Sequence, residues 1–155
     1  MSRSKKTGKA ELNVQYQKKT AQAKLSNEEK RPVWTFENID KDGKFRFDPG
    51  RVDFNCCDFL TKMLAFSSMT WSEIKKQTHD NGKSKHHFLD ARALSKEAEK
   101  RIETKGLIDV QEYIYSFALN NTVRVLGIRY PNTDIFSVVW YDANHEFSIS
   151  FKKHT

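Results

Sequence analysis

Two arginines in the C-terminal third of the chain, Arg124 and Arg129, have the side chain best suited to bind phosphate. Both lie in an apolar run from Thr122 to Tyr130. A buried guanidinium is unfavourable unless it is paired, so each should face solvent, a carboxylate or an anionic ligand. In an unbroken strand the two side chains point to opposite faces, but Gly127 between them is a candidate for a bulge. A bulge there would turn both guanidiniums to one face as a phosphate clamp; without it, one arginine is a structural ion-pair partner.

His145 is the candidate for proton transfer, because imidazole titrates near neutral pH. Asp142 precedes it by three residues, close enough to orient the ring or raise its pKa. In the alternative interpretation, Asp142 and Asn144 form an Asx turn and His145 only packs. Lys152 and Lys153 add positive charge after the last predicted strand, either for phosphate binding or only for solubility.

Other catalytic or metal-binding patterns are weak. His86 and His87 are adjacent, so in a strand they point to opposite faces and cannot share one metal ion without a bend. We expect a surface pair, with one member touching an anion, rather than a metal site. The sequence has no glycine-rich phosphate loop, no nucleophile elbow and no paired-cysteine metal motif. It therefore predicts no metal and no cofactor, and it disfavours nucleotide hydrolases, ester hydrolases and zinc enzymes.

The elements that must position these residues are mainly strands. Three apolar-rich runs, 113–119, 122–130 and 135–141, are separated by turn signals, which is typical of an antiparallel meander. A further strand is predicted at 33–39, with 44–47 as a possible hairpin partner across an Asp-Lys-Asp-Gly turn.

Helices are predicted between these strands. Asp53 or Asn55 can cap a helix that runs to about residue 66, with a stripe of Phe54, Cys57, Leu60 and Leu64 widened by Phe59 and Met63. Thr70 begins a capping box, and Ser95 caps a helix that Gly106 ends. The expected fold class is α+β: a four- or five-stranded antiparallel sheet, with two or three helices packed on one face.

Charge divides the chain into two parts. Residues 1–31 hold nine Lys or Arg and three Glu, whereas residues 32–155 hold eighteen basic and seventeen acidic residues. The sequence therefore predicts a basic, disordered tail over 1–31 and one domain over 32–155. The tail either attracts polyanions or only aids solubility. No apolar run reaches the roughly 18 residues of a membrane span, and the adjacent Cys56 and Cys57 indicate a reducing compartment, so we expect a cytoplasmic protein.

The segments MTWSEIKKQ, KHHFLDARALSKEAEKRI and RVLGIRYPNTDIFSVVWYDANHEFSISFKKHT resemble a family of uncharacterised bacterial proteins. The resemblance covers residues 32–155 and includes the WYDxxHE pattern and the KKHT ending. It implies a bacterial or phage-related origin, and it carries no assigned activity.

The order of a strand, two helices and a meander with a basic middle strand also resembles the RelE/ParE toxin superfamily. Some members cleave mRNA on the ribosome, using basic residues to align attack of a ribose 2′-hydroxyl on the adjacent phosphate. The segment LNNTVRVLGIRY is similar to their penultimate strand pair, which implies a phosphate contact for Arg124, and His145 falls where some members carry a terminal acid or base.

The resemblance implies a metal-independent, toxin-type endoribonuclease in a toxin–antitoxin or phage-defence setting, with RNA or the ribosome as target and an antitoxin-like protein as partner. Arg124 and Arg129 would hold phosphate, and His145, oriented by Asp142, would move the proton. The alternatives are a non-enzymatic module that binds nucleic acid or protein, and an antitoxin or immunity-like partner.

Overall fold

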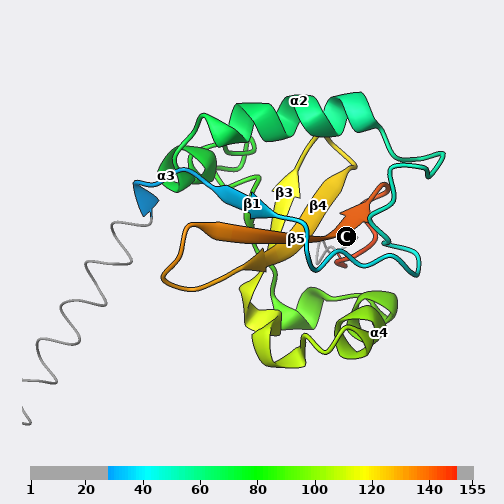
Figure 1. The fold of residues 1–155 in the computed structure, drawn as a ribbon. Coiled ribbons are helices and arrows are strands. Elements are labelled where there is room, and N and C mark those ends of the chain that lie inside the picture. Colours follow the sequence, from blue (N-terminus) through cyan, green and yellow to red (C-terminus); the bar gives the residue numbers. More distant parts are fainter. Residues whose placement is uncertain (1–27, 150–155) are drawn as a thin grey trace, which may run out of the picture.

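The computed structural model describes residues 28–149 and confirms the α+β class (Figure 1). The strands are β1 (Val33–Thr35), β2 (His87–Phe88), β3 (Ile114–Ala118), β4 (Arg124–Arg129) and β5 (Ile135–Asp142). The helices are α2 (Cys56–Ser67), α3 (Trp71–Lys75) and α4 (Lys96–Thr104), with the 3-10 turns η1 (Ala91–Ala93) and η2 (Ile108–Tyr113). In this part of the chain, no helix combines the length and the apolar character that crossing a membrane requires.

The five strands form one sheet in the order β1-β5-β4-β3-β2. The predicted meander is confirmed, because β3, β4 and β5 pair as antiparallel neighbours. The N-terminal strand differs from the expectation: β1 lies parallel to β5, and Val33 is opposite Ile135. The predicted hairpin is wrong as well, because the 44–47 segment instead makes an isolated bridge from Arg46 to Trp140 of β5.

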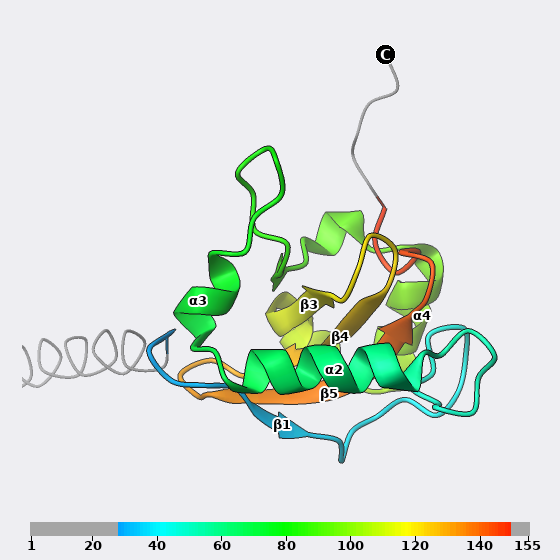
Figure 2. The ribbon, with the colours of Figure 1, turned by 90° about the horizontal axis from the view of Figure 1, so that it is seen from above.

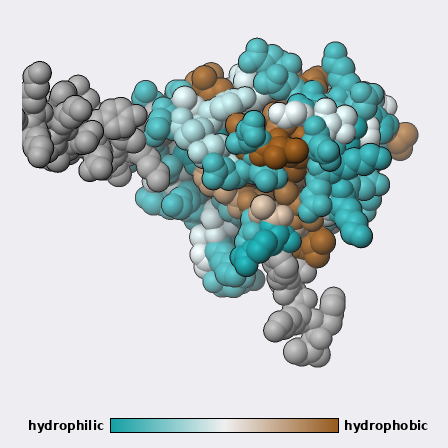
Figure 3. Space-filling model, turned by 90° about the horizontal axis from the view of Figure 1, so that it is seen from below, coloured by the Kyte–Doolittle hydropathy of each residue, from teal (hydrophilic) through white to brown (hydrophobic). Residues whose placement is uncertain are grey.

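Helices cover both faces of the sheet, not one. One core cluster joins the sheet to α2 and α3 through Met63, Phe66, Trp71 and Ile74. The other joins the opposite face to α4, which contributes Ala98 and Ile102. Figures 1 and 2 show the sheet between α2 on one side and α4 on the other. The physical reason is the burial of β4 and β5 on both faces, since an antiparallel sheet with two apolar faces needs cover on both. Figure 3 views the α4 side, where hydrophilic side chains surround an apolar patch.

The predicted helix boundaries are confirmed by their caps. The side chains of Asn55, Thr70 and Ser95 accept hydrogen bonds from the backbone amides three residues later, at 2.9, 3.1 and 3.2 Å. Each bond satisfies an amide that the first helical turn leaves without a partner. Gly106 ends α4 with a φ of +69°, a conformation that glycine adopts without strain.

The buried face of α2 differs from the predicted stripe. Leu60 and Leu64 are 57% and 64% exposed, whereas Met63 and Phe66 are buried and Phe59 packs partly against the core. The helix is therefore rotated by about one residue from the expected orientation. The predicted stripe through Leu60 and Leu64 and the observed one through Met63 and Phe66 lie side by side on the helix. The contacts that α2 makes with the sheet therefore decide which stripe is buried.

A buried ion pair joins α4 to the segment that follows β1. Arg101 donates two hydrogen bonds of 2.8 Å to the carboxylate of Asp40, which also accepts one from the indole of Trp140 at 3.0 Å. Burial raises the pKa of Asp40, but the hydrogen bonds from Arg101, Asp42 and Trp140 outweigh it and leave the pKa below its ordinary value of 3.8.

Candidate functional site

A hollow of about 1030 Å³ opens at the end of the sheet where β3 turns into β4. Three further segments line it: the middle of α2, the loop that continues to residue 86 from the end of α3, and the turn that follows β5. In Figure 2, the loop at 78–85, the β3–β4 turn and the turn after β5 lie on the same side of α2. Apart from the histidines, the basic lining residues are Lys62, Lys85 and Arg124, and the acidic one is Asp80. Three cations against one carboxylate make the hollow electropositive.

The bulge expected at Gly127 lies on the neighbouring strand. Leu126 pairs with Trp140 and Gly127 pairs with Val138, so the extra residue is Val139 of β5. Gly127 is needed for the close approach of the two strands, because a Cβ there would lie 1.9 Å from the carbonyl oxygen of Ser137. The pairing of β4 with β3 is regular, so the side chains of β4 alternate without a break. The two arginines therefore face opposite sides, and the expected clamp does not form.

Arg129 lies on the face covered by α2 and α3, outside the hollow. Its guanidinium carbon is 4.1 Å from the ring centroid of Trp71, and Nη2 is 2.6 Å from the carboxylate of Glu28. The amide of Trp71 also donates to the carbonyl oxygen of Lys30 at 2.9 Å. Arg129 is thus the structural ion-pair partner of the second interpretation, and contacts with the folded body begin before residue 32.

Arg124 lines the hollow and also holds the β3–β4 turn. Nη1 donates to the carbonyl oxygens of Asn120 and Val123 at 2.7 and 3.0 Å. These acceptors are neutral, so they do not cancel the positive charge. Burial lowers the pKa of Arg124 and the nearby charge of Asp142 raises it, with a net lowering; a guanidinium nevertheless stays cationic in proteins.

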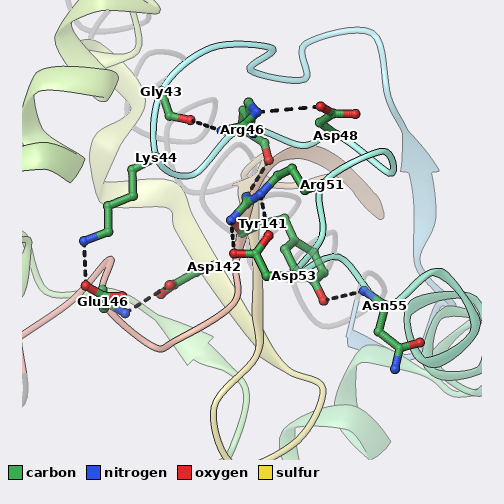
Figure 4. A network of polar contacts seen from close by, with 10 residues as sticks. All are labelled: Gly43, Lys44, Arg46, Asp48, Arg51, Asp53, Asn55, Tyr141, Asp142 and Glu146. Atoms are coloured by element: carbon green, nitrogen blue, oxygen red, sulfur yellow. Dashed lines mark hydrogen bonds and ion pairs between the residues drawn. The ribbon is translucent and has the colours of Figure 1, made fainter.

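His145 lines the same hollow, on the turn after β5. Asp142 fixes this turn: its carboxylate accepts hydrogen bonds from the amides of Glu146 and Phe147 at 3.0 and 2.8 Å (Figure 4 shows the first). Asp142 caps the turn, as part of the alternative interpretation expected, but His145 lines the hollow and does not pack in the core. Within residues 28–149, no hydrogen bond joins Asp142 to His145. His145 has a φ of +55° and is exposed. Partial burial of the ring and the charge of Arg124 lower its pKa, against the opposing charge of Asp142, and so favour the neutral imidazole.

Figure 4 also shows how the base of this turn is held. The buried side chain of Arg51 forms two hydrogen bonds of 2.8 Å with Asp53 and donates to the carbonyl oxygens of Arg46 and Tyr141. The hydroxyl of Tyr141 accepts a bond of 3.2 Å from the amide of Asn55. The end of β5, and with it the start of the turn that carries His145, is therefore joined to the loop before α2.

The loop at 78–85 is anchored by His86, which is buried and not on the surface as expected. The imidazole Nδ1 accepts a 3.0 Å hydrogen bond from the amide of Ala118, and Nε2 lies 2.7 Å from Oε1 of Gln77. Burial is the largest of several effects that lower its pKa from 6.5 to about 4, so the ring is neutral at pH 7. His87, in contrast, is exposed, and its Nδ1 lies 2.9 Å from the carbonyl oxygen of Phe88.

Sequence reasoning had not placed Lys62, His79 or Lys85 in the site. The sequence signal for two of them is the polar stretch from Thr78 to Lys85, which has basic residues around an Asn-Gly turn. No sequence signal indicates Lys62, because lysines are common on the exposed face of amphipathic helices.

Comparisons find no match. Neither the protein-family models, nor the curated proteins, nor the solved structures contain a significant relative of this chain. Within residues 28–149, no group of three or more His, Cys, Asp or Glu is arranged to hold a metal ion. Lys152 and Lys153 lie outside the described residues, as do residues 1–27 of the predicted basic tail.

Proposed function

We propose that this protein binds RNA and that the hollow receives the phosphate backbone. The observation that carries the proposal is the convergence of Lys62, Lys85 and Arg124 from three separate elements on one opening. Cations that come from distant parts of a sequence repel one another, and a bound polyanion offsets that repulsion. Neutralising phosphates also releases condensed counterions, which supplies most of the affinity in such interfaces.

The size and chemistry of the lining favour a strand over a single small anion. The volume of about 1030 Å³ is at the upper end of the range for ligand sites, roughly 300–1,000 Å³. Asn81 and Asn121 add amide side chains, which can hydrogen-bond to base edges and sugar hydroxyls. Phe66 also lines the hollow but is 3% exposed, so its ring offers no stacking platform. We therefore expect binding that is dominated by phosphate contacts.

In its most specific form the proposal is an RNA-directed, toxin-type protein, as the resemblance to the RelE/ParE superfamily implies. The setting would be toxin–antitoxin or phage defence, and an antitoxin-like protein would be the partner. What supports this form is the position of Arg124 and His145 on one hollow. Arg129 has no part in it.

Fluorescence anisotropy with a labelled single-stranded RNA of randomised sequence tests the proposal. The full-length double variant K62A/K85A should bind at least tenfold more weakly than the wild type. It should also reduce the dependence of log K on log salt by about 1.4, because each lost phosphate contact on a single strand accounts for about 0.7. The control variant K96A/K100A removes the same charge from the exposed surface of α4 and should bind normally.

Equal weakening by both variants would indicate nonspecific attraction and would refute a site in the hollow. Removal of residues 1–27 distinguishes the alternative in which the basic tail provides the affinity. If that truncation abolishes binding while K62A/K85A in the full chain leaves it unchanged, the tail binds RNA and the hollow does not.

A further inference from the structure

Residues 77–85 form a short two-stranded hairpin at the rim of the hollow. Thr78 and Ser84 pair across it, and a backbone hydrogen bond of 2.8 Å lies on each side of this pair. Gly82 at the tip has a φ of +79°, and a Cβ there would meet no atom within 4 Å. Figure 2 shows this segment, in green above α3, extending away from the sheet. We call it the hairpin arm, because its tip projects into open space.

The base of the hairpin arm is fixed to the sheet. His86 directly follows the arm, and its Nδ1 accepts a 3.0 Å hydrogen bond from the amide of Ala118 in β3. Its Nε2 lies 2.7 Å from Oε1 of Gln77, at the start of the arm. Both strands of the arm are therefore held at the base, and the arm keeps one direction relative to the hollow.

One face of the hairpin arm continues the positive charge of the hollow. His79 and Lys85 lie on this face and line the hollow. Lys83 precedes Lys85 by two residues on the same strand, so its side chain points to the same face. Lys83 is exposed and does not line the hollow. The row of basic side chains therefore extends along the arm, beyond the rim.

The hairpin arm lacks the aromatic rings on which the bases of a single strand stack. Residues 77–85 contain no Phe, Tyr or Trp, and Phe66 in the hollow is buried. In a double helix the bases stack on one another, so a protein can bind it through its backbone and grooves alone. We propose that the RNA is double-helical, with the phosphates of one strand in the hollow and the hairpin arm in the adjoining minor groove. This inference rests on the proposed RNA binding and names the class of RNA.

The tip of the arm has the chemistry that this groove requires. The minor groove of an RNA helix is wide and shallow and displays the ribose 2′-hydroxyls. Asp80 is exposed at the tip, and a carboxylate can accept a hydrogen bond from a hydroxyl but is repelled by phosphate. The amide of Asn81 offers both a donor and an acceptor. Lys83, farther along the arm, can reach a phosphate at the edge of the groove.

Fluorescence anisotropy with the full-length protein and three labelled probes tests the inference. The probes are an RNA stem of about 16 base pairs, the length that double-stranded RNA-binding domains span, a DNA duplex of the same sequence, and a single-stranded RNA. Attraction by charge alone predicts that the two duplexes bind alike. Contact with the 2′-hydroxyls predicts instead that the RNA stem binds about tenfold more tightly than the DNA duplex.

Two substitutions in the hairpin arm make the comparison specific. K83E should weaken binding of the RNA stem about tenfold and leave single-strand affinity within about twofold, because Lys83 lies outside the hollow. D80K adds positive charge, so simple attraction predicts tighter binding of every probe. In the minor groove it removes the hydroxyl acceptor, and the preference for RNA stem over DNA duplex should fall. The control K100E makes the same charge change as K83E on the exposed surface of α4 and should leave that preference unchanged.

The outcomes separate this inference from the proposed function. K62A/K85A should weaken binding of all three probes, because both lysines line the hollow. If the RNA stem and the DNA duplex bind equally, or if K83E weakens the single strand as much as the stem, the inference is wrong while RNA binding stands. If no RNA probe binds, or if K62A/K85A binds as wild type does, the proposed function fails and the inference fails with it.

Discussion

Replacing His86 with Gln should remove a large part of the pH dependence of folding stability. Burial lowers the pKa of this histidine from 6.5 to about 4 in the folded protein. The unfolded chain therefore binds the proton first as the pH falls, and the folded state loses stability between about pH 6.5 and pH 4. The fall in pKa corresponds to about 3 kcal/mol in total, of which about 2 kcal/mol is lost by pH 5.

Urea unfolding followed by tryptophan fluorescence measures this effect, because Trp34, Trp71 and Trp140 all lie in the folded body. The free energy of unfolding is compared at pH 7.5, 6 and 5 for wild type, H86Q and the exposed-histidine control H87Q. Wild type and H87Q should lose about 2 kcal/mol more than H86Q between pH 7.5 and pH 5.

The comparison uses the slope with pH and not the absolute stability. H86Q also disturbs the hydrogen bonds to Ala118 and Gln77, which should cost about 1–3 kcal/mol at every pH. Parallel stability curves for wild type and H86Q would refute the buried, neutral histidine and, with it, the anchoring of the loop at 78–85.

Three more predictions concern the framework. D40A should lower the free energy of unfolding by about 3 kcal/mol or more, since it leaves Arg101 without its partner. In the wild type, this contribution should be lost as the pH falls below 4, because the pKa of Asp40 in the folded protein is below its ordinary value. G127A should be destabilised by about 3 kcal/mol or fail to fold, because its Cβ would collide with the Ser137 carbonyl oxygen; a thermal melt measures this. R129A should lower the melting temperature and leave RNA affinity within twofold of wild type, because Arg129 lies outside the hollow.

The controls for these variants come from the surface. R92A breaks an exposed ion pair with Asp90 but keeps the hydrogen bond from the amide of residue 92 to Asp90, so it should leave the melting temperature unchanged. G50A adds a methyl group at an exposed turn without positive φ and should cost far less stability than G127A. A tenfold loss of RNA affinity in R129A would contradict the placement of the two arginines on opposite faces.

Features set by a few neighbouring residues could be predicted from the sequence. The caps at Asn55, Thr70 and Ser95 are such features, because the capping side chain and the amide it satisfies are only three residues apart. The meander is another, since turn signals separate its three strands.

Features that depend on partners far away in the sequence could not be predicted from it. The sequence cannot show which of two overlapping stripes on α2 meets the sheet, and it therefore predicted a buried Leu60. Gly127 correctly marked an irregular pairing, but a glycine does not show which strand carries the extra residue, and here it is Val139. Of the predicted site, Arg124 and His145 do share a hollow, whereas Arg129 does not.

The parallel pairing of β1 with β5 has a consequence for protein synthesis. Val33 is among the first residues of the domain to leave the ribosome, and its partner Ile135 leaves about a hundred residues later. At a typical elongation rate of roughly 5–20 residues per second, the nascent N-terminal strand waits for several seconds without its neighbour. Closing so long a loop is entropically unfavourable until the meander exists to receive the strand. We therefore expect β1 to dock last, so that the domain is completed only after β5 has left the ribosome.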